Sequence, residues 1–205
     1  MEEKNIQENI LNAATIIFVE KGKAGARMQE IADKAGVNKM LLHYYFRNKD
    51  LLFQEVVKQI INDLYKFVMI ESFNSQSFKE VLNTFINRHF EFLYERRKVL
   101  HFFLWELSCE KIDLKETVLG TYAKFGGNPF EALEKKLNEA MQKGEIRQVK
   151  PADFIINLFS LNLFLFIALP FIQAALPIDE QKISFMIEQR KNEIFRLLWN
   201  DIKIN

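Results

Sequence analysis

Apolar residues recur along most of this chain with the three- and four-residue spacing of amphipathic helices, and no segment alternates in the manner of a β-strand. Proline is absent before Pro129, so long helices are permitted throughout the first half. Breaks between helices are expected at Gly22, Gly36, 73–75, 95–97, 126–129, Gly144 and Pro151. The pattern predicts an all-α protein of about nine helices.

Capping residues place several of the helix starts. Asn5, with Glu8 three positions later, is typical of the start of a first helix, which Gly22 then ends. Asn48 is the expected N-cap of a long fourth helix. Asn128, followed by Pro129 at the first helical position, marks a later start.

Residues 28–46, MQEIADKAGVNKMLLHYYF, predict two short helices that meet at a tight turn. Gly36 suits that turn because it has no Cβ, and Ala32 is small enough for a second helix to cross closely. The inward-facing residues are expected to be Ile31, Val37, Leu42 and Phe46. Asn38, Lys39, Met40, His43 and Tyr44 then point outward, and their mixture of apolar and polar tips suits the major groove of DNA.

Charge supports this interpretation locally, although the whole chain carries only +1. Residues 21–49 contain seven basic and two acidic side chains, which makes that segment +5 and leaves the remainder net negative. A basic patch of this kind attracts phosphates without regard to sequence. A solvated basic loop is the alternative explanation of the charge alone.

Residues 10–57 resemble the DNA-binding domain of the TetR/AcrR family of transcriptional regulators. The resemblance lies in the Ala13-Ala14 pair, Phe18, Gly22, the Ala35-Gly36-Val37 turn and the aromatic run 44–46 before Lys49. It implies an N-terminal three-helix helix-turn-helix domain at 1–48 and a helical ligand-binding and dimerisation domain at 49–205. It also implies a dimer that places its third helix in the major groove of operator DNA.

The same resemblance carries DNA-contact roles to individual positions. Lys39, Met40 and Leu41 match positions that face bases, while His43, Tyr45 and Lys49 match positions that contact phosphate. The full expected DNA-binding set is Arg27, Gln29, Asn38, Lys39, Met40, Leu41, His43, Tyr44, Tyr45 and Lys49. Three positions depart from the family. Ala26 and Arg27 replace residues that are often hydroxyl-bearing, so a capping hydroxyl is missing and a guanidinium is available for phosphate. Gln29 replaces a residue that is basic in many members, and it either reads an adenine edge or is solvated.

The remaining residues are rich in phenylalanine, with 20 in the chain and only two in its first 50 residues. Apolar walls with a few polar groups suit a pocket for a hydrophobic ligand, although a phenylalanine stripe is also typical of a core. The candidate pocket residues are Phe85, His89, Phe92, Phe102, Phe103, Trp105, Tyr122 and Phe125. The histidines lack convincing metal spacing, and Cys109 lacks a base partner, so no metal, cofactor or catalytic thiol is expected.

Phe154–Ile178 contains no charged side chain over 25 residues, which is long enough to span a membrane. Pro170 and the polar Asn157, Asn162 and Gln173 oppose that interpretation and favour a soluble helix at a subunit interface, where the amides fix register. The expected dimer face, shared with the last helix at 179–202, comprises Phe159, Leu163, Phe166, Ile187, Ile194 and Leu198.

Together these features predict a cytoplasmic, ligand-responsive transcriptional regulator. It is expected to be a dimeric repressor that a small hydrophobic molecule releases from double-stranded operator DNA. The chain offers no nucleophile–base set, phosphate loop or metal spacing, so an enzyme is not expected. A carrier of hydrophobic molecules without sequence-specific DNA binding, and a regulator attached to a membrane, are the alternatives.

Overall fold

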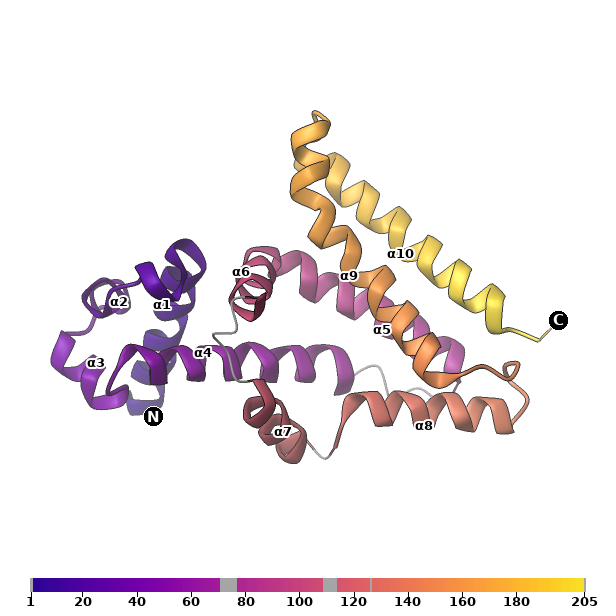
Figure 1. Ribbon diagram of the computed structural model, residues 1–205, viewed down its shortest axis with the longest axis horizontal. Coiled ribbons are helices and arrows are strands. Elements are labelled where there is room, and N and C mark those ends of the chain that lie inside the picture. Colours follow the sequence, from indigo (N-terminus) through magenta and orange to yellow (C-terminus); the bar gives the residue numbers. More distant parts are fainter. Residues whose placement is uncertain (1, 71–76, 109–113, 126, 205) are drawn as a thin grey trace. The chain divides into compact units, whose positions relative to one another are not determined.

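The computed structural model describes residues 2–70, 77–108, 114–125 and 127–204, and these ranges are almost entirely helical (Figure 1). The helices are α1 (Glu2–Gly25), α2 (Met28–Ala35), α3 (Lys39–Tyr45), α4 (Lys49–Leu64), a π-helical segment η1 (Tyr65–Ile70), α5 (Phe78–Glu95), α6 (Arg97–Ser108), α7 (Leu114–Phe125), α8 (Pro129–Gln142), α9 (Pro151–Ala175) and α10 (Glu180–Ile202). Strand pairing within the described ranges is limited to an isolated bridge between Ile146 and Lys203. The predicted all-α fold is confirmed.

Ten α-helices are described where about nine were expected. The additional one arises between residues 97 and 126, where the sequence shows no turn-forming cluster and the structure has α6 and α7. The first helix begins at Glu2, three residues before the expected start at Asn5. The starts expected from Asn48 and Asn128 hold: the Asn48 side chain accepts from Leu51 N at 2.9 Å, and that of Asn128 accepts from Phe130 N at 2.9 Å. Side-chain capping of the first free amides therefore fixes these ends as predicted.

The chain divides into two compact units. The first comprises Met1–Asp63 and Lys98–Thr121, and the second comprises Leu64–Arg97 and Tyr122–Asn205. Helices α1 to α4 and α6 therefore belong to the first unit, and α5, α8, α9 and α10 belong to the second. The domain boundary expected between residues 48 and 49 stays a prediction.

The core of the first unit is built around three edge-to-face phenylalanines. Phe18 of α1 lies 5.2 Å from Phe53 of α4, and Phe53 lies 5.9 Å from Phe102 of α6, measured between ring centroids. Each buried ring contributes about 1.5–3 kcal/mol through burial alone. These contacts place α6 against α1 and α4, two of the four helices (α1 to α4) that we call the N-terminal head.

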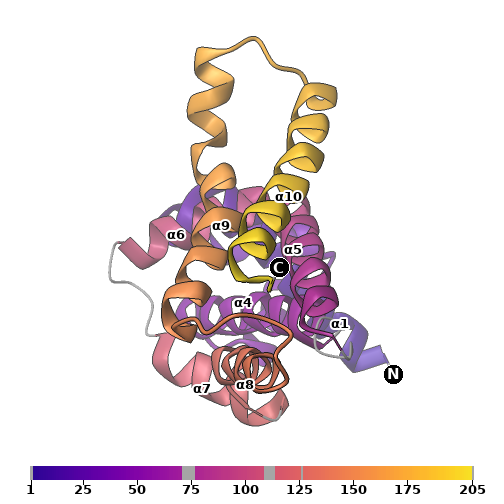
Figure 2. The ribbon, with the colours of Figure 1, turned by 90° about the vertical axis from the view of Figure 1, so that its right-hand side faces the viewer.

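The core of the second unit lies between α5, α9 and α10, which pack against one another, while α8 packs against α9. Phe90 of α5 meets Phe166 of α9 at 5.3 Å, and Phe78 meets Phe154 at 6.0 Å. Helices α9 and α10 form a hairpin whose connecting turn stands clear of the other helices of this unit (Figure 2). Apolar side chains near that turn, including Phe171 and Leu176, are exposed.

Candidate nucleic-acid interface

The turn between α2 and α3 has the geometry that its sequence predicts. Gly36 adopts a left-handed φ of 69°, and Val37 N donates to Ala32 O at 3.0 Å, which closes the end of α2. Ile31, Leu42 and Phe46 are buried beneath this turn. The packing of these three side chains fixes which side of α3 faces outward.

The outward side of α3 is the candidate interface. Met40 is 83% exposed and Tyr44 is 75% exposed, although both are large side chains with mostly apolar surface. Asn38 caps the helix, since its Oδ1 accepts from Leu41 N at 2.7 Å. Lys39 is exposed beside that cap. A short helix with a fixed start and an uncovered mixed face suits insertion into a major groove.

All ten expected DNA-binding residues lie in the first unit, between the start of α2 and the start of α4. The exposed members are Arg27, Gln29, Asn38, Lys39, Met40 and Tyr44, and the half-buried members are Leu41, His43, Tyr45 and Lys49. Whether each touches DNA stays a prediction.

Lys49 has an internal role that the sequence did not indicate. Its ammonium group donates to the carbonyl oxygens of Ala24 and Ala26, at 3.2 and 3.1 Å. An ammonium has three N–H donors, so one is left for a phosphate once these two are engaged. Lys49 therefore ties the start of α4 to the link between α1 and α2.

His43 and Gln29 also make contacts within the head. His43 Nδ1 donates to the carbonyl of Arg47 at 3.1 Å, because a carbonyl oxygen can only accept. The other ring nitrogen of a neutral His43 is then an acceptor. Gln29 Nε2 donates to Asp33 Oδ1 at 2.8 Å, which holds this amide along the surface of α2.

A buried carboxylate from α6 supports the break at the end of α1. Gly22 has a left-handed φ of 68°, and Glu106 Oε1 accepts from the next amide, Lys23 N, at 3.2 Å. Glu106 is only 2% exposed, and its Oε2 has no hydrogen-bond partner. Glu106 is not among the site residues expected from the sequence, where its signal is a single acidic residue in the aromatic segment 102–107.

The eight candidate pocket residues are divided between the two units. Phe102, Phe103 and Trp105 belong to the first unit, where Phe102 is in the core and Trp105 is 66% exposed. The other five belong to the second unit and are Phe85, His89, Phe92, Tyr122 and Phe125. Tyr65 of η1 stacks on Phe125 at 4.9 Å. Whether these residues line a pocket stays a prediction.

A buried polar pair lies between α5 and α9 of the second unit. Asn162 Nδ2 lies 3.2 Å from His89 Nδ1, and Asn162 Oδ1 has no hydrogen-bond partner. Desolvation lowers the pKa of His89 from 6.5 to about 4, so the ring is neutral near pH 7. Asn162 was expected at a subunit interface, but the structure buries it completely within its own chain.

A groove of about 480 Å³ lies close to this pair, between α8 and α9. Its lining residues are Phe130, Glu134, Ala152, Ile155, Ile156, Phe159 and Ser160. None of them was among the candidate pocket residues, although Phe159 was assigned to the dimer face. Because α9 has no charged residue after Asp153, its sequence does not distinguish residues of a groove, a core and an interface.

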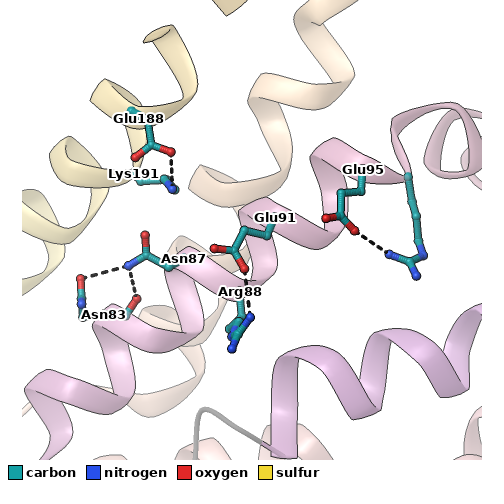
Figure 3. A network of polar contacts seen from close by, with 8 residues as sticks. Asn83, Asn87, Arg88, Glu91, Glu95, Glu188 and Lys191 are labelled. Atoms are coloured by element: carbon teal, nitrogen blue, oxygen red, sulfur yellow. Dashed lines mark hydrogen bonds and ion pairs between the residues drawn. The ribbon is translucent and has the colours of Figure 1, made fainter. Parts of the chain in front are cut away.

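Polar side chains elsewhere on α5 are paired (Figure 3). Asn87 Nδ2 donates to Asn83 O at 2.8 Å, and Arg88 pairs with Glu91 at 3.2 Å. On α10, the buried Lys191 forms an ion pair with Glu188. These partners contrast with the unpaired Asn162 Oδ1.

The residues expected at the dimer face lie mainly inside the chain. Phe166, Ile187, Ile194 and Leu198 are buried, and Phe159 and Leu163 are half-buried. The exposed apolar side of α9 comprises Ile156, Phe164, Ile167 and Phe171, which we call the α9 stripe. It is turned from the expected face by roughly one residue's rotation, since successive residues differ by about 100°. We therefore base the dimer proposal on the α9 stripe and not on the face expected from the sequence.

Among the described helices, α9 alone is long and apolar enough to cross a membrane, and 28% of its most apolar window is buried within the chain. Fewer than a third of the residues in that window are thus buried in a single copy. No cluster of three or more potential metal ligands occurs in the part of the chain that the structure describes.

Comparison with known proteins agrees with this architecture. Residues 10–56 match the family described as bacterial regulatory proteins, tetR family. The Staphylococcus aureus negative transcriptional regulator IcaR, of a biofilm operon, is 24% identical over 202 residues, covering 94% of this chain and 97% of IcaR.

Solved structures show the same fold. The regulator FadR of Bacillus subtilis, in complex with stearoyl-CoA, has a TM-score of 0.70 at 19% identity, over 93% of this chain and 96% of FadR. The TetR family regulator PfmR of Thermus thermophilus has a TM-score of 0.68 at 20% identity, over 91% and 97% of the two chains. The matched head, the relative that aligns over most of both chains and the shared fold agree: residues 10–56 match the tetR family of bacterial regulatory proteins, and the whole chain has the fold of TetR family regulators.

Proposed function

We propose that this protein is a cytoplasmic homodimeric repressor that binds operator DNA through α3. It leaves the DNA when a small hydrophobic molecule binds the second unit, which we call the body. The observation that carries the proposal is the uncovered side of α3, where Lys39, Met40 and Tyr44 project beside a capped helix start. IcaR, a negative regulator, supports repression as the direction of the response. FadR, solved with an acyl-CoA, supports a ligand site in the body.

The dimer follows from the α9 stripe. Phe164 is 66% exposed and Phe171 is 79% exposed on one side of a helix without charged residues after Asp153. Soluble proteins rarely leave such a surface in water, and an equivalent stripe on a second copy is a self-complementary partner. If a second copy covers the α9 stripe, its apolar surface is shielded from water without a membrane.

The switch is proposed to work through differential affinity. A ligand shifts the protein off DNA only if it binds better to the conformation whose heads do not fit the operator. Two routes lead from the body helices to the head: α4, which continues into η1, and α6, whose Glu106 holds the break in α1. π-Helical segments such as η1 are frequent at functional sites.

Selection of bound sequences from random oligonucleotides tests the proposal. A single preferred operator is expected, with two half-sites about 34–36 Å apart. Failure to enrich any operator would support a carrier of hydrophobic molecules instead.

Binding to the selected operator then tests α3 directly. Lys39→Ala is expected to weaken binding and lower its salt dependence by about one ion, while Met40→Ala relaxes the sequence preference. The matched control is Lys58→Ala, because Lys58 lies on α4 and pairs with Glu55. Equal salt slopes for Lys39→Ala and the control would contradict this docking.

A further inference from the structure

The groove between α8 and α9 has the size and chemistry of a small-molecule site. Its volume of about 480 Å³ lies within the range of such sites, and most of its lining residues are apolar. Phe130 and Ile156 are exposed on its two sides. Glu134 and Ser160 supply the polar groups of its lining.

One aromatic ring separates this groove from the buried polar pair. The half-buried ring of Phe159 lies 5.2 Å from Phe130 on the groove side and 5.5 Å from His89 on the inner side. Phe159 is therefore the side chain that would have to move for a molecule in the groove to reach His89 and Asn162.

The polar pair is incomplete as it stands. Asn162 is fully buried, and its amide faces His89 through one end only. Exchanging the amide oxygen and nitrogen does not solve this, because the opposite end then lacks a partner. A buried amide end without a partner is costly and rare in folded proteins.

We propose that this groove binds a small, uncharged, mostly apolar molecule whose single hydroxyl or amide group passes Phe159 and bonds to Asn162. The proposal rests on the proposed function, because it names the ligand class of the body. A hydroxyl or primary amide both donates and accepts, so it can complete the pair in either orientation of the Asn162 amide.

Charge at the site selects against anions, and the cost of burying a charge beside a neutral polar pair selects against cations as well. Burial keeps His89 neutral, since its pKa falls to about 4, so the polar pair offers no counter-charge to a carboxylate. Outside the groove, the adjoining hollow of α8 is lined by Glu131, Glu134 and Glu139 with one lysine, Lys135. This acidic rim repels anions, including the phosphates of an acyl-CoA.

Competition binding with matched eight-carbon compounds tests the proposal. The neutral dye Nile red is bound to the purified protein and displaced by 1-octanol, octanamide, octanoate or octylammonium. The two neutral compounds are expected to displace the dye at concentrations about tenfold lower than the two ions. Equal displacement by octanoate and 1-octanol would overturn the proposal, as would failure of the dye to bind.

Substitutions then locate the contact. Asn162→Leu, which keeps the side-chain size, is expected to remove the preference for neutral compounds while Nile red still binds. Asn157→Leu, at an exposed amide on the same helix, is the control and is expected to keep the preference. An unchanged preference in Asn162→Leu would contradict the assignment.

A second variant decides the matter if Asn162→Leu does not fold. Phe159→Ala removes the separating ring, and faster association of 1-octanol is expected in stopped-flow measurements. An unchanged association rate would show that Phe159 is not the moving wall and would overturn the proposal.

Two further measurements distinguish this inference from the dimer proposal and from the proposed function. If Nile red dissociates the dimer in sedimentation velocity, the groove is part of the contact between copies and the proposal fails. Operator binding is measured on the same preparations without ligand. If the protein binds an operator but shows no preference for neutral compounds, only this inference is overturned. If it shows that preference but binds no operator, the proposed function is overturned.

Discussion

Buried and exposed apolar residues are distributed differently in the head and in α9, although both are helical. In α3, polar neighbours mark the outer side, so Leu42 is buried while Met40 is exposed. In α9, apolar residues occupy every side, and Phe164 is exposed although Phe166, two positions later, is fully buried. Sequence specifies orientation where polar residues interrupt the apolar ones, and tertiary packing specifies it where they do not.

The largest expected effect compares the two phenylalanines of α9. Phe166→Ala should lower the free energy of unfolding by about 3–5 kcal/mol, because it leaves a cavity against Phe90. Phe164→Ala should change it by less than about 0.5 kcal/mol in the monomer and weaken the dimer instead. Urea unfolding at a concentration that keeps the chain monomeric, together with sedimentation velocity, measures both. Similar unfolding energies for the two variants would remove the distinction between core and stripe.

A smaller effect on the free energy of unfolding is expected from pH, and it arises from His89 of the second unit. Burial lowers the pKa of His89 from 6.5 to about 4, so between these values the unfolded chain binds a proton that the folded chain does not. Stability should therefore fall as pH drops, by about 2 kcal/mol from pH 7.5 to pH 5. His89→Gln should lose this part of the slope, and His101→Gln should keep it. Parallel curves for wild type and His89→Gln would show that His89 is accessible to protons in the folded chain.

The smallest expected effect concerns the start of α3. Asn38→Ala removes the bond to Leu41 N and should destabilise the first unit by about 1 kcal/mol. Asn192→Ala, at an exposed position inside α10, is the control and should be neutral or slightly stabilising, because alanine is the better helix former. Thermal unfolding followed by circular dichroism measures the pair. An Asn38→Ala protein as stable as the control variant would show that the cap is dispensable.

Sequence predicted those parts of the fold that depend on local chemistry. Gly36, Asn48 and Asn128 act within four residues of their own positions, so their roles could be inferred directly from neighbouring residues. The boundary between α6 and α7 was missed because no glycine or proline marks it. The pairing of His89 with Asn162 joins residues 73 positions apart, and the contact of Glu106 with Lys23 joins residues 83 apart. Such contacts depend on how helices pack, which periodicity along the chain does not encode.

The separation of buried and exposed residues on α3 also bears on how such a head evolves. Leu42 and Phe46 hold the helix in place, while Lys39, Met40 and Tyr44 contribute little to the core. Substitutions at the exposed positions are therefore nearly free of a stability penalty. Under the proposed docking of α3, a duplicated copy of this protein would acquire a new operator by changing those three side chains, and it would keep its fold throughout the transition.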